Sequence, residues 1–388
     1  MSASQSTMSA SDLLSADGPV CLVIKAQLKP VGDTDRFQPA GFPEVGHVIY
    51  DAPRANQTKQ KVCIVDSPAS MANHLETVCL AAAGSLDLHD DLTNLPYVLC
   101  ETGDPDTRMS VCSTFTEGHR LASDYFLDST QDEISFRQVL RKEFKIIEVK
   151  KDKTYFIPPE TWWSIFETVF KYDPNSLVHG VMFAKEQIKI SRLLTAHLEA
   201  FGASRVGRSG VKFDRLQKTT SGQPIFSVDE ETAESIQATF IIDLGLLRSY
   251  GRGNKGLSGK QKQLLLDLAL WKVKQLLARP FRYRTQCFLG CTSISVETEG
   301  GPYVSQPTRE VVARSERDVE NIETPAASDL LPPLLKVLNI KESIKACGFD
   351  VAQETRVYYP AADLFKAGKD AEQPTDGGDD DDPSDDDE

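Results

Sequence analysis

The sequence predicts a mixed α+β protein, and three local patterns support this. Residues 20–30 alternate apolar and polar side chains, the period of a strand with one buried face. Ser67 and Pro68 fit the N-cap and first position of a helix. Residues 260–278 are apolar nearly all round, as in a buried helix. At 388 residues the chain has room for two or three domains, or for one domain enlarged by insertions.

The first strand has a basic and polar open side, because Lys25 falls between its apolar positions. A Gly- and Pro-rich loop follows at residues 31–46, and two more strand-like runs cover 47–50 and 62–66. The last of these runs leads directly into the helix that starts at Pro68. We therefore expect a strand, a hairpin and a helix in the first part of the chain.

The predicted helices have recognisable ends and faces. The helix that starts at Pro68 continues with apolar residues at three- and four-residue spacing, and we expect it to stop at Gly84. Farther on, Trp162, Phe166 and Phe170 recur every four residues after a Pro-Pro start, which favours a core-facing helix. We expect these rings to belong to the core and not to a ligand platform.

Composition excludes several classes of protein. Apolar residues make up 40% of the chain and charged residues 26%, which is typical of globular proteins. No apolar run approaches the roughly 18 residues that a membrane helix needs. The first sixteen residues lack the basic and apolar parts of a signal peptide. The 8 cysteines form no C-x-x-C pair, so we expect reduced thiols and a cytoplasmic protein with no membrane partner.

The charge is distributed unevenly. The net charge is −14, but residues 371–388 hold ten acids and no base, which leaves only −4 for the rest. Bases are concentrated in residues 137–153, 202–218 and 245–285, the last with ten Lys or Arg against one acid. A polyanion responds to a local basic surface and not to a remote acidic tail. We therefore expect these segments to form a continuous track for a nucleic-acid backbone.

Both ends of the chain have compositions typical of disorder. Residues 1–17 are small and polar without a period, and residues 367–388 are acidic with Pro and Gly. We expect both segments to be disordered and the acidic tail to aid solubility. Shielding of the basic track by the tail is the alternative.

The string G-R-G-N-K-G at residues 251–256 matches the dinucleotide fingerprint G-x-G-x-x-G before a predicted helix. After Asp267 the next acid is Glu297, so no acid lies where such sites hold a ribose hydroxyl. A nucleotide-cofactor enzyme is thus a weak alternative. The same glycines let Arg252 and Lys255 approach phosphates, unless the loop is only a flexible solvated one.

Metal and catalytic signals are weak. The 6 histidines show no metal-ligand spacing, and we expect neither a metal nor another cofactor. His119 and His179 have residue types suited to acid–base cleavage of RNA, but nothing pairs them. Asp33 and Asp35, in the loop after the first strand, suit either a metal site or ordinary turn chemistry.

A basic stripe is predicted in residues 179–200. Lys185, Lys189 and Arg192 follow each other at steps of four and three, which on a helical turn places them on one side. His197 lies five residues farther on. Such a stripe suits a groove that tracks a nucleic-acid backbone, and its alternative is an ordinary solvated face.

Ordered sequence strings add a family resemblance to these patterns. They resemble the RAMP-type (repeat-associated) backbone subunit of type I-G, formerly I-U, CRISPR interference complexes over about residues 20–295. The strings are R-F-Q-P-A-G-F-P-E-V-G (36–46), D-S-P-A-S-M-A-N-H-L-E (66–76), L-P-Y-V (95–98), E-G-H-R-L-A-S (117–123), H-G-V-M-F-A-K-E-Q-I-K-I-S-R-L-L-T-A-H-L-E-A (179–200), L-R-S-Y-G-R-G (247–253), L-A-L-W-K (268–272) and R-Y-R-T-Q-C (282–287).

The resemblance implies a modified RNA-recognition-motif (ferredoxin-like) palm with helical and finger insertions and a thumb hairpin. One such domain would cover residues 18–366, with the insertion, finger and thumb region at about 130–225. The usual RNP aromatic string of this fold is missing, so base stacking is not expected.

The resemblance also implies a non-enzymatic function. Copies of the chain would line up along one guide RNA (crRNA) and present its spacer for pairing with target DNA. The large subunit and the guide-end-capping or processing subunit would be further partners. The RNA-binding candidates are Lys25, Arg36, Gln38, Ser70, Asn73, Arg120, Lys185, Arg192, Arg205, Arg208, Arg248, Arg252 and Lys255.

An enzyme of the same superfold is the main alternative. Type III backbone subunits look similar and cut target RNA with a metal and an acid in the loop after the first strand. Asp33 and Asp35 occupy that loop in this chain.

Overall fold

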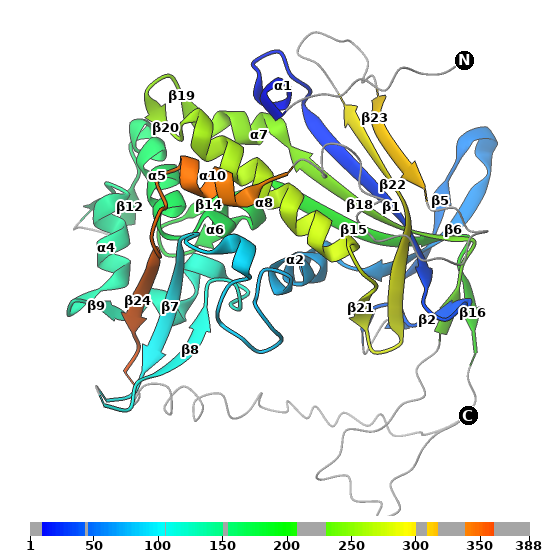
Figure 1. Cartoon of the computed structure of the whole chain (residues 1–388), viewed down its shortest axis with the longest axis horizontal. Helices are drawn as coiled ribbons and strands as arrows, with labels where there is room; N and C mark the ends of the chain where they lie inside the picture. Colours follow the sequence, from blue (N-terminus) through cyan, green and yellow to red (C-terminus); the bar gives the residue numbers. More distant parts are fainter. Residues whose placement is uncertain are drawn as a thin grey trace, which may run out of the picture.

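The protein is built on one large sheet, with a second sheet and most of the helices beside it (Figure 1). The computed structural model describes residues 10–42, 46–104, 106–149, 154–207, 230–299, 309–316 and 338–360. The predicted mixed α+β class is confirmed.

The large sheet has eight strands, and every neighbouring pair in it is antiparallel. In spatial order the strands are β21 (Phe281–Arg284), β22 (Cys287–Glu299), β1 (Cys21–Pro30), β18 (Ser235–Asp243), β15 (Leu194–Phe201), β6 (Lys59–Asp66) and β5 (Ile49–Pro53), and β23 (Arg309–Glu316) pairs with β22.

The register of the central strands gives this sheet one buried and one open face. Ile24 of β1 lies opposite Phe240 on one side and Val296 on the other, and all three are fully buried. The next residue, Lys25, points to the other face and lies opposite Thr239. The predicted strand with Lys25 on its open side is therefore confirmed.

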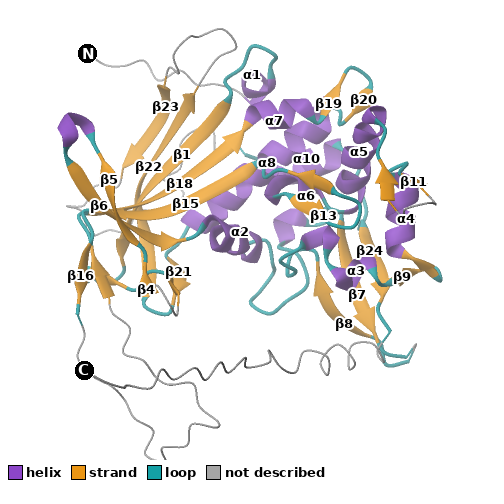
Figure 2. Cartoon of the chain, turned by 180° about the vertical axis from the view of Figure 1, so that it is seen from behind, coloured by secondary structure: helices purple, strands orange, loops and turns teal. Residues whose placement is uncertain are grey.

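Three helices cover the buried face of the sheet (Figures 1 and 2). They are α2 (Pro68–Thr77) against β15, α7 (Leu244–Ser249) against β1 and α8 (Gly259–Leu277) against β18. Both long helices are well capped, α2 by Ser67 and α8 by a capping box between Ser258 and Gln261. Burial of one α8 residue after another, from Leu264 to Val273, confirms the predicted apolar helix.

The helix α2 ends earlier than the predicted stop at Gly84. Its last residue is Thr77, because the chain then turns to pair Leu80 with Leu88 in an isolated bridge. The main-chain N–H of His89 also donates to the carbonyl of Cys79 at 2.7 Å. These non-local bonds replace the helical ones.

The segment between α2 and β15 forms the second unit, a five-stranded sheet with its own helices. The C-terminal strand β24 joins it parallel to β7, so distant parts of the chain meet there. Its strands in order are β10 (Ile134–Ser135), β9 (Thr130–Gln131), β24 (Glu354–Tyr358), β7 (Tyr97–Thr102) and β8 (Met109–Ser113), and the helices are α3 (Asp124–Leu127), α4 (Phe136–Glu143), α5 (Trp162–Tyr172) and α6 (Pro174–His179).

The remaining elements are short. The helix α10 (Ile340–Ala346) packs on α8, and α1 (Ala10–Leu14) contacts α7 and α8. One small sheet has three strands, β16 (Ser204–Val206), β17 (Glu230–Thr232) and β2 (Arg36–Phe37). The two-stranded sheets are β3 (Gly41–Phe42) with β4 (Gly46–His47), β11 (Ile147–Val149) with β12 (Thr154–Phe156), β13 (Val181–Phe183) with β14 (Ile188–Ile190), and β19 (Gly251–Arg252) with β20 (Lys255–Gly256). The 3-10 turns are η1 (Ala55–Gln57), η2 (Asp90–Leu92), η3 (Arg120–Ala122) and η4 (Pro159–Thr161).

The aromatic face of α5 belongs to the core, as predicted. The ring of Phe166 lies 6.1 Å from that of Trp162 and 4.8 Å from that of Tyr250. Phe170 is 1% exposed and stacks on Phe349 from the C-terminal part of the chain. These contacts tie α5 to the segments before and after α8.

Two expectations need correction. Beyond His179, which ends α6, the stretch 179–200 is not helical, because it forms the β13–β14 hairpin and β15, in which buried and exposed residues alternate. The predicted insertion, finger and thumb region at about 130–225 includes β15 of the large sheet, and its bounds stay a prediction. The expected disorder of residues 1–17 is wrong for the part that α1 occupies, where Leu13 is fully buried. Residues 367–388 lie outside the described residues.

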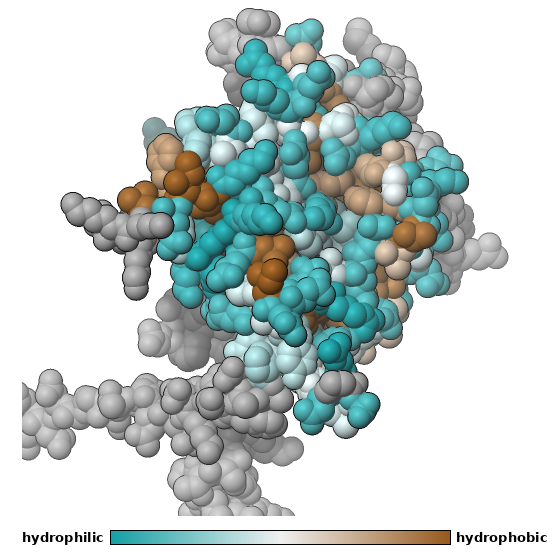
Figure 3. Space-filling view, turned by 90° about the vertical axis from the view of Figure 1, so that its left-hand side faces the viewer, coloured by the Kyte–Doolittle hydropathy of each residue, from teal (hydrophilic) through white to brown (hydrophobic). Residues whose placement is uncertain are grey.

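The surface on the side of α4, β9 and β12 is mostly hydrophilic, with separate apolar patches (Figure 3). Ile134, Ile147 and Phe156 are about half exposed, at 52%, 53% and 53%. In the described part of the chain, no helix is both long and apolar enough to cross a membrane.

Candidate nucleic-acid interface

The first turn of α2 is held rigidly in place. The hydroxyl of Ser67 accepts from the Ser70 N–H at 3.2 Å, and the Asp66 carboxylate accepts from the Ser67 N–H at 2.9 Å. Ser70 Oγ also donates to Asp66 Oδ2 at 3.0 Å. The strand β6 and the helix α2 are therefore locked together where one becomes the other.

Asp66 fixes an arginine beside this turn. Arg284 Nη2 donates to Asp66 Oδ1 at 2.7 Å and to Ser70 Oγ at 3.2 Å, and His74 Nε2 lies 2.8 Å from Asp66 Oδ2. Burial would raise the pKa of Asp66, but the hydrogen bonds from His74 and Arg284 hold it below its ordinary value. The Arg284 side chain remains 39% exposed, so a positioned guanidinium faces solvent.

The Ser70, His74 and Asp66 side chains do not form a nucleophilic triad. In such a triad the two ring nitrogens of histidine contact the hydroxyl and the carboxylate separately. In this site the single atom His74 Nε2 faces both Asp66, at 2.8 Å, and Ser70 Oγ, at 3.4 Å. The arrangement positions Arg284 and does not activate a nucleophile.

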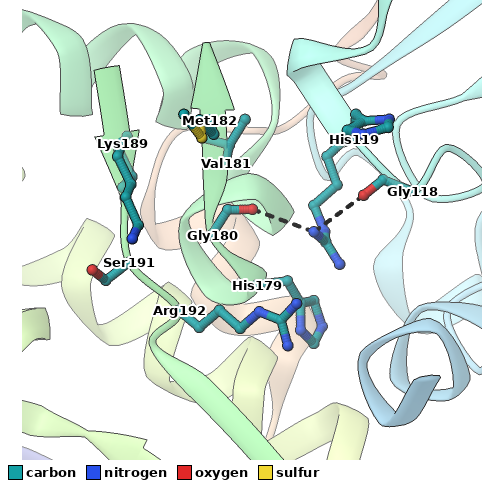
Figure 4. A pocket seen from close by; sticks show the side chains of 11 residues that line it. Gly118, His119, His179, Gly180, Val181, Met182, Lys189, Ser191 and Arg192 are labelled. Atoms are coloured by element: carbon teal, nitrogen blue, oxygen red, sulfur yellow. Dashed lines mark hydrogen bonds between the residues drawn. The ribbon is translucent and has the colours of Figure 1, made fainter. Parts of the chain in front are cut away.

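A second arginine reaches the same turn from the other side. Arg192 Nη1 donates to the Pro68 carbonyl at 3.1 Å. Arg192, Ser191 and Lys189 also line a pocket of about 330 Å³ that faces the turn at Gly118 (Figure 4). We call Lys189, Arg192 and Arg284 the α2 cluster. Arg192 and Arg284 contact the first turn of α2, and Lys189 joins Arg192 in lining the adjoining pocket.

A buried polar network supports this surface from below. Arg120 donates to both carboxylate oxygens of Glu76, at 2.6 and 2.9 Å, and to the Gly180 carbonyl at 3.3 Å. Asn175 donates to Glu76 at 2.8 Å and accepts from Lys272. Arg120 and Lys272 are thus held inside the fold, and Arg120 acts on the surface through the hairpin that it anchors.

Asp173 belongs to the same buried region. Burial raises its pKa to about 7, against the lowering effect of the Ser176 hydroxyl, which donates to it at 2.6 Å. It also caps α6 by accepting from the Asn175 N–H. A carboxyl group that keeps its proton up to about pH 7 fits a region already crowded with charges.

Other predicted RNA-binding residues are paired with carboxylates. Lys25 lies 3.3 Å from Glu297, and Arg36 lies 3.8 Å from Glu230. Arg205 lies 3.2 Å from Glu231, on the same small sheet as Arg36. Lys25 is therefore partly neutralised on the open face of the large sheet. Arg36 and Arg205, with side chains 51% and 48% exposed, keep accessible guanidinium groups.

The remaining predicted residues lie in several places. Gln38 donates its main-chain N–H to Gln286, two residues after Arg284, which links the β2 loop to the α2 cluster. Lys185 is exposed in the turn of the β13–β14 hairpin, and Asn73 is exposed on α2. Arg208 lies outside the described residues.

Two of the residues predicted from the Gly-rich region lie far from the α2 cluster. Arg252 and Lys255 are exposed on the β19–β20 hairpin, which Figures 1 and 2 show at the opposite end of the molecule from β2 and β16. Arg248 donates to the carbonyls of Leu13 and Pro19, so it fastens the N-terminal segment.

The G-R-G-N-K-G string does not form a dinucleotide site. It makes a short hairpin and does not connect a sheet strand to a helix, which the fingerprint requires. A Cβ on Gly251 would lie 2.1 Å from the Leu257 carbonyl oxygen, so packing explains this glycine. The Gly256 N–H is already taken by the Glu167 carboxylate at 2.9 Å.

The acids of the enzyme alternative lie at a separate pocket. Asp33 and Asp35 line a cavity of about 220 Å³ together with Glu234 and Lys29. Within the described ranges, no group of three or more His, Cys, Asp or Glu side chains is arranged to hold a metal ion.

The three basic segments do not make one continuous basic surface in the described part of the chain. On α4, Arg137 pairs with Asp124 and Asp128, and Arg141 pairs with Glu186. Most of 202–218 is not described, and the residues of 245–285 are divided between the core and two ends of the molecule. Of the basic track predicted from charge counts, the α2 cluster and the neighbouring β2 loop remain as a basic surface.

Sequence reasoning missed Arg284 as an individual candidate, and it named Lys189 only as a member of the predicted basic stripe. Both lay in segments that it had marked, R-Y-R-T-Q-C and the 179–200 stripe. Arg284 matters through its contact with the first turn of α2, although it lies 214 positions away from Ser70 in the sequence. Lys189 matters through the pocket that it lines with Arg192. The spacing of residues in a motif cannot show such a long-range contact, and the only signal in the sequence was the string that contains the residue.

The chain was also compared with known proteins. Residues 22–205 match the family model described as CRISPR-associated protein GSU0053. No curated protein matches the chain. A chain of a solved structure described as "CRISPR RNA-guided surveillance complex, pre-nicking" is similar at 8% sequence identity and a TM-score of 0.36, over 71% of this chain and 75% of that chain.

A second solved structure, Thermofilum pendens Csc2, is similar at 10% identity and a TM-score of 0.23, over 74% of this chain and 67% of that chain. Both scores are too low to establish a shared fold. The family match rests on the sequence and not on the structure. It covers the start of α2, the pocket and the β13–β14 hairpin. It supports a resemblance of residues 22–205, a little under half of the chain, to a CRISPR-associated family.

Proposed function

We propose that this protein is the guide-RNA-binding backbone subunit of a type I-G surveillance complex. Copies of the chain would assemble along one crRNA and present its spacer for pairing with target DNA. The family match supports the CRISPR role, and the α2 cluster supports the contact with RNA. The cluster is the observation that carries the proposal, because its arginines are positioned by the fold and still reach solvent.

The topology supports a modified RNA-recognition-motif palm. The inner strands run in the order β22-β1-β18-β15, with α2 and α8 on one face. Read along the chain, these elements give the β-α-β-β-α-β sequence of a ferredoxin-like fold, with β5 and β6 added at one edge. We assign this palm to the proposed domain over residues 18–366, and the second unit to its insertions.

The chemistry of binding follows from the side chains available. Lys189, Arg192 and Arg284 suit phosphate oxygens, since guanidinium groups match phosphate geometry and ammonium groups act as point charges. On the open face, Lys25 and Thr239 occupy central positions of β1 and β18, where a stacking protein carries aromatic rings. The strand would be held by its backbone, and its bases would remain free to pair with a target.

The proposed partners are guide RNA, further copies of the chain, the large subunit and the guide-end-capping or processing subunit. Target DNA would be contacted through the guide. We propose a cytoplasmic location and no catalytic step, metal or other cofactor.

Co-expression of the full chain with a guide RNA tests the proposal. We expect the purified oligomer to retain RNA at low salt, and the logarithm of its affinity to fall with log salt by roughly 0.7 per phosphate contact. A chain that never retains RNA at low ionic strength, or an affinity independent of salt, contradicts the proposal.

The type III-like ribonuclease remains the alternative function, because Asp33 and Asp35 line one cavity. Assembled complex would be incubated with complementary RNA and Mg²⁺. Evenly spaced cleavage that disappears in Asp33→Ala or Asp35→Ala favours the alternative. Intact target RNA favours the binding function.

A further inference from the structure

The pocket beside the α2 cluster has features that phosphate binding does not use. Its volume of about 330 Å³ is at the small end of ligand sites, which run from roughly 300 to 1,000 Å³. Val181, Met182 and Ile190 give it an apolar wall next to the cations. Its size and mixed lining suit a single nucleotide unit.

The mouth of this pocket is positively charged. Among the described residues, neither Lys189 nor Arg192 has a carboxylate partner, and Arg192 donates only to a carbonyl. The third cation of the pocket, Arg120, is compensated by Glu76. The uncompensated charge at the mouth therefore belongs to Lys189 and Arg192, and it attracts an anion.

His179 lines the pocket and is the unusual residue in it. It is 1% exposed, and neither ring nitrogen has a hydrogen-bond partner among the described residues. A buried polar group without a partner is rare and calls for an explanation. Figure 4 shows the Arg192 side chain reaching toward the imidazole, from the side of the pocket.

The imidazole is neutral at physiological pH. Burial, and then the positive charges of Lys272, Arg120 and Arg192, hold the pKa of His179 well below its ordinary value. The Glu76 carboxylate of this region is engaged with Arg120 and Asn175. A neutral imidazole offers one donor and one acceptor.

One hydrogen-bond donor and one acceptor on the same ring match a hydroxyl group better than a phosphate. A phosphodiester oxygen only accepts hydrogen bonds, whereas a ribose 2′-hydroxyl both donates and accepts, and it distinguishes RNA from DNA. A phosphate at the mouth would pair with the Arg192 and Lys189 cations, which leaves the ring nitrogens of His179 for the sugar. Phosphate and sugar of one unit then have separate partners.

We propose that the pocket holds one nucleotide unit of the bound strand, with its phosphate at Lys189 and Arg192 and its 2′-hydroxyl at His179. His179 is then a specificity-determining residue for RNA over DNA. This inference rests on the proposed RNA binding and adds the choice of sugar.

The test compares single-stranded RNA and DNA of one sequence, bound to the full chain and followed by fluorescence anisotropy. We expect the wild-type chain to prefer RNA about tenfold, the effect of roughly one net hydrogen bond. His179→Phe should reduce the preference to about twofold or less by weakening RNA and leaving DNA unchanged. RNA carrying 2′-O-methyl groups should bind the wild-type chain like DNA.

Two variants serve as controls. His179→Gln keeps a donor and an acceptor and should retain more of the preference than His179→Phe. Lys142→Ala, on the exposed side of α4 and outside the pocket lining, should leave the RNA-to-DNA ratio unchanged. Thermal melts establish whether each variant is folded. If His179→Phe does not fold, the 2′-O-methyl experiment on the wild-type chain still tests recognition of the 2′-hydroxyl.

The inference is overturned when the wild-type chain binds RNA and DNA equally, when 2′-O-methyl RNA binds like RNA, or when folded His179→Phe keeps the full preference. These outcomes leave the proposed function intact. A chain that binds no RNA at all refutes the proposed function itself.

Discussion

The basic residues near α4 and those of the α2 cluster look alike in the sequence and differ in the structure. Near α4, Arg141 pairs with Glu186 at 2.6 Å and Lys171 pairs with Glu143 at 2.8 Å. In the α2 cluster, Lys189 and Arg192 have no described carboxylate partner, and Arg284 shares Asp66 with His74. Cations near α4 serve the fold, and those of the α2 cluster are available to a ligand.

The difference teaches that local charge counts overestimate a binding surface. A carboxylate that neutralises a base often comes from a distant segment, as Glu186 does for Arg137 and Arg141. Only the bases left over after such pairing attract a polyanion. The following predictions test this distinction, from the largest expected effect to the smallest.

The largest effect is expected below the α2 cluster. Arg120→Ala leaves the Glu76 carboxylate, which is 3% exposed, without its bidentate partner. Removing one partner of a buried ion pair costs about 3–5 kcal/mol of folding free energy. Urea unfolding followed by circular dichroism measures the loss, and a variant as stable as wild type contradicts the structural role of Arg120.

A smaller loss is expected near α4. Arg137→Ala removes hydrogen bonds to Asp124 and Asp128, each 3.1 Å long. We expect unfolding free energy to fall by about 2 kcal/mol, as for hydrogen bonds to charged groups. RNA affinity of the folded variant should stay at the wild-type value in a filter-binding assay. A variant that loses RNA affinity without losing stability would contradict our inference that Arg137 stabilises the fold and does not bind RNA.

The carboxyl group beside Arg284 should appear in the acid stability of the protein. Because the pKa of Asp66 is below its ordinary value in the folded state, its contribution is present above that ordinary value, about 4, and is lost as pH falls further. Asp66→Asn should therefore differ most from wild type near neutrality and least in acid. Urea midpoints at several pH values measure this, and a difference that grows toward low pH contradicts it.

The contribution of Asp173 to stability should change with pH in the opposite direction to that of Asp66. Its pKa is raised to about 7, so between its ordinary value and pH 7 the folded state keeps a proton that the unfolded chain has lost. Its contribution to stability therefore falls as pH rises through this range and is constant above it. Asp173→Asn keeps an oxygen for the α6 cap and should gain stability relative to wild type from pH 4 to pH 8. Parallel curves for both proteins would refute the raised pKa.

Elements governed by local patterns could be predicted from the sequence. The alternation in β1, the Ser67 cap of α2 and the apolar length of α8 depend on neighbours within a few residues. The spacing of Lys185, Lys189 and Arg192 fits a helix and a hairpin with its turn equally well, so tertiary pairing decided the outcome. No local pattern indicates that β24 returns to pair with β7.

The candidate site was predictable only in part. Ser70 and Arg192 were identified through the family strings, and the structure brings both to the first turn of α2. The roles of Lys25 and Arg248 were not foreseeable, because their partners Glu297 and Leu13 lie more than two hundred residues away in the chain. The neutralising partners are long-range, and a single sequence does not show them.

The salt dependence of RNA affinity, measured side by side for two double variants, tests the central claim most directly. Lys189→Ala with Arg192→Ala should reduce the slope of log affinity against log salt by about 1.4, for two lost phosphate contacts. Arg141→Ala with Lys171→Ala removes the same charge and should leave the slope unchanged. Equal changes in both pairs, or no change in the first, would contradict an RNA-binding role specific to the α2 cluster.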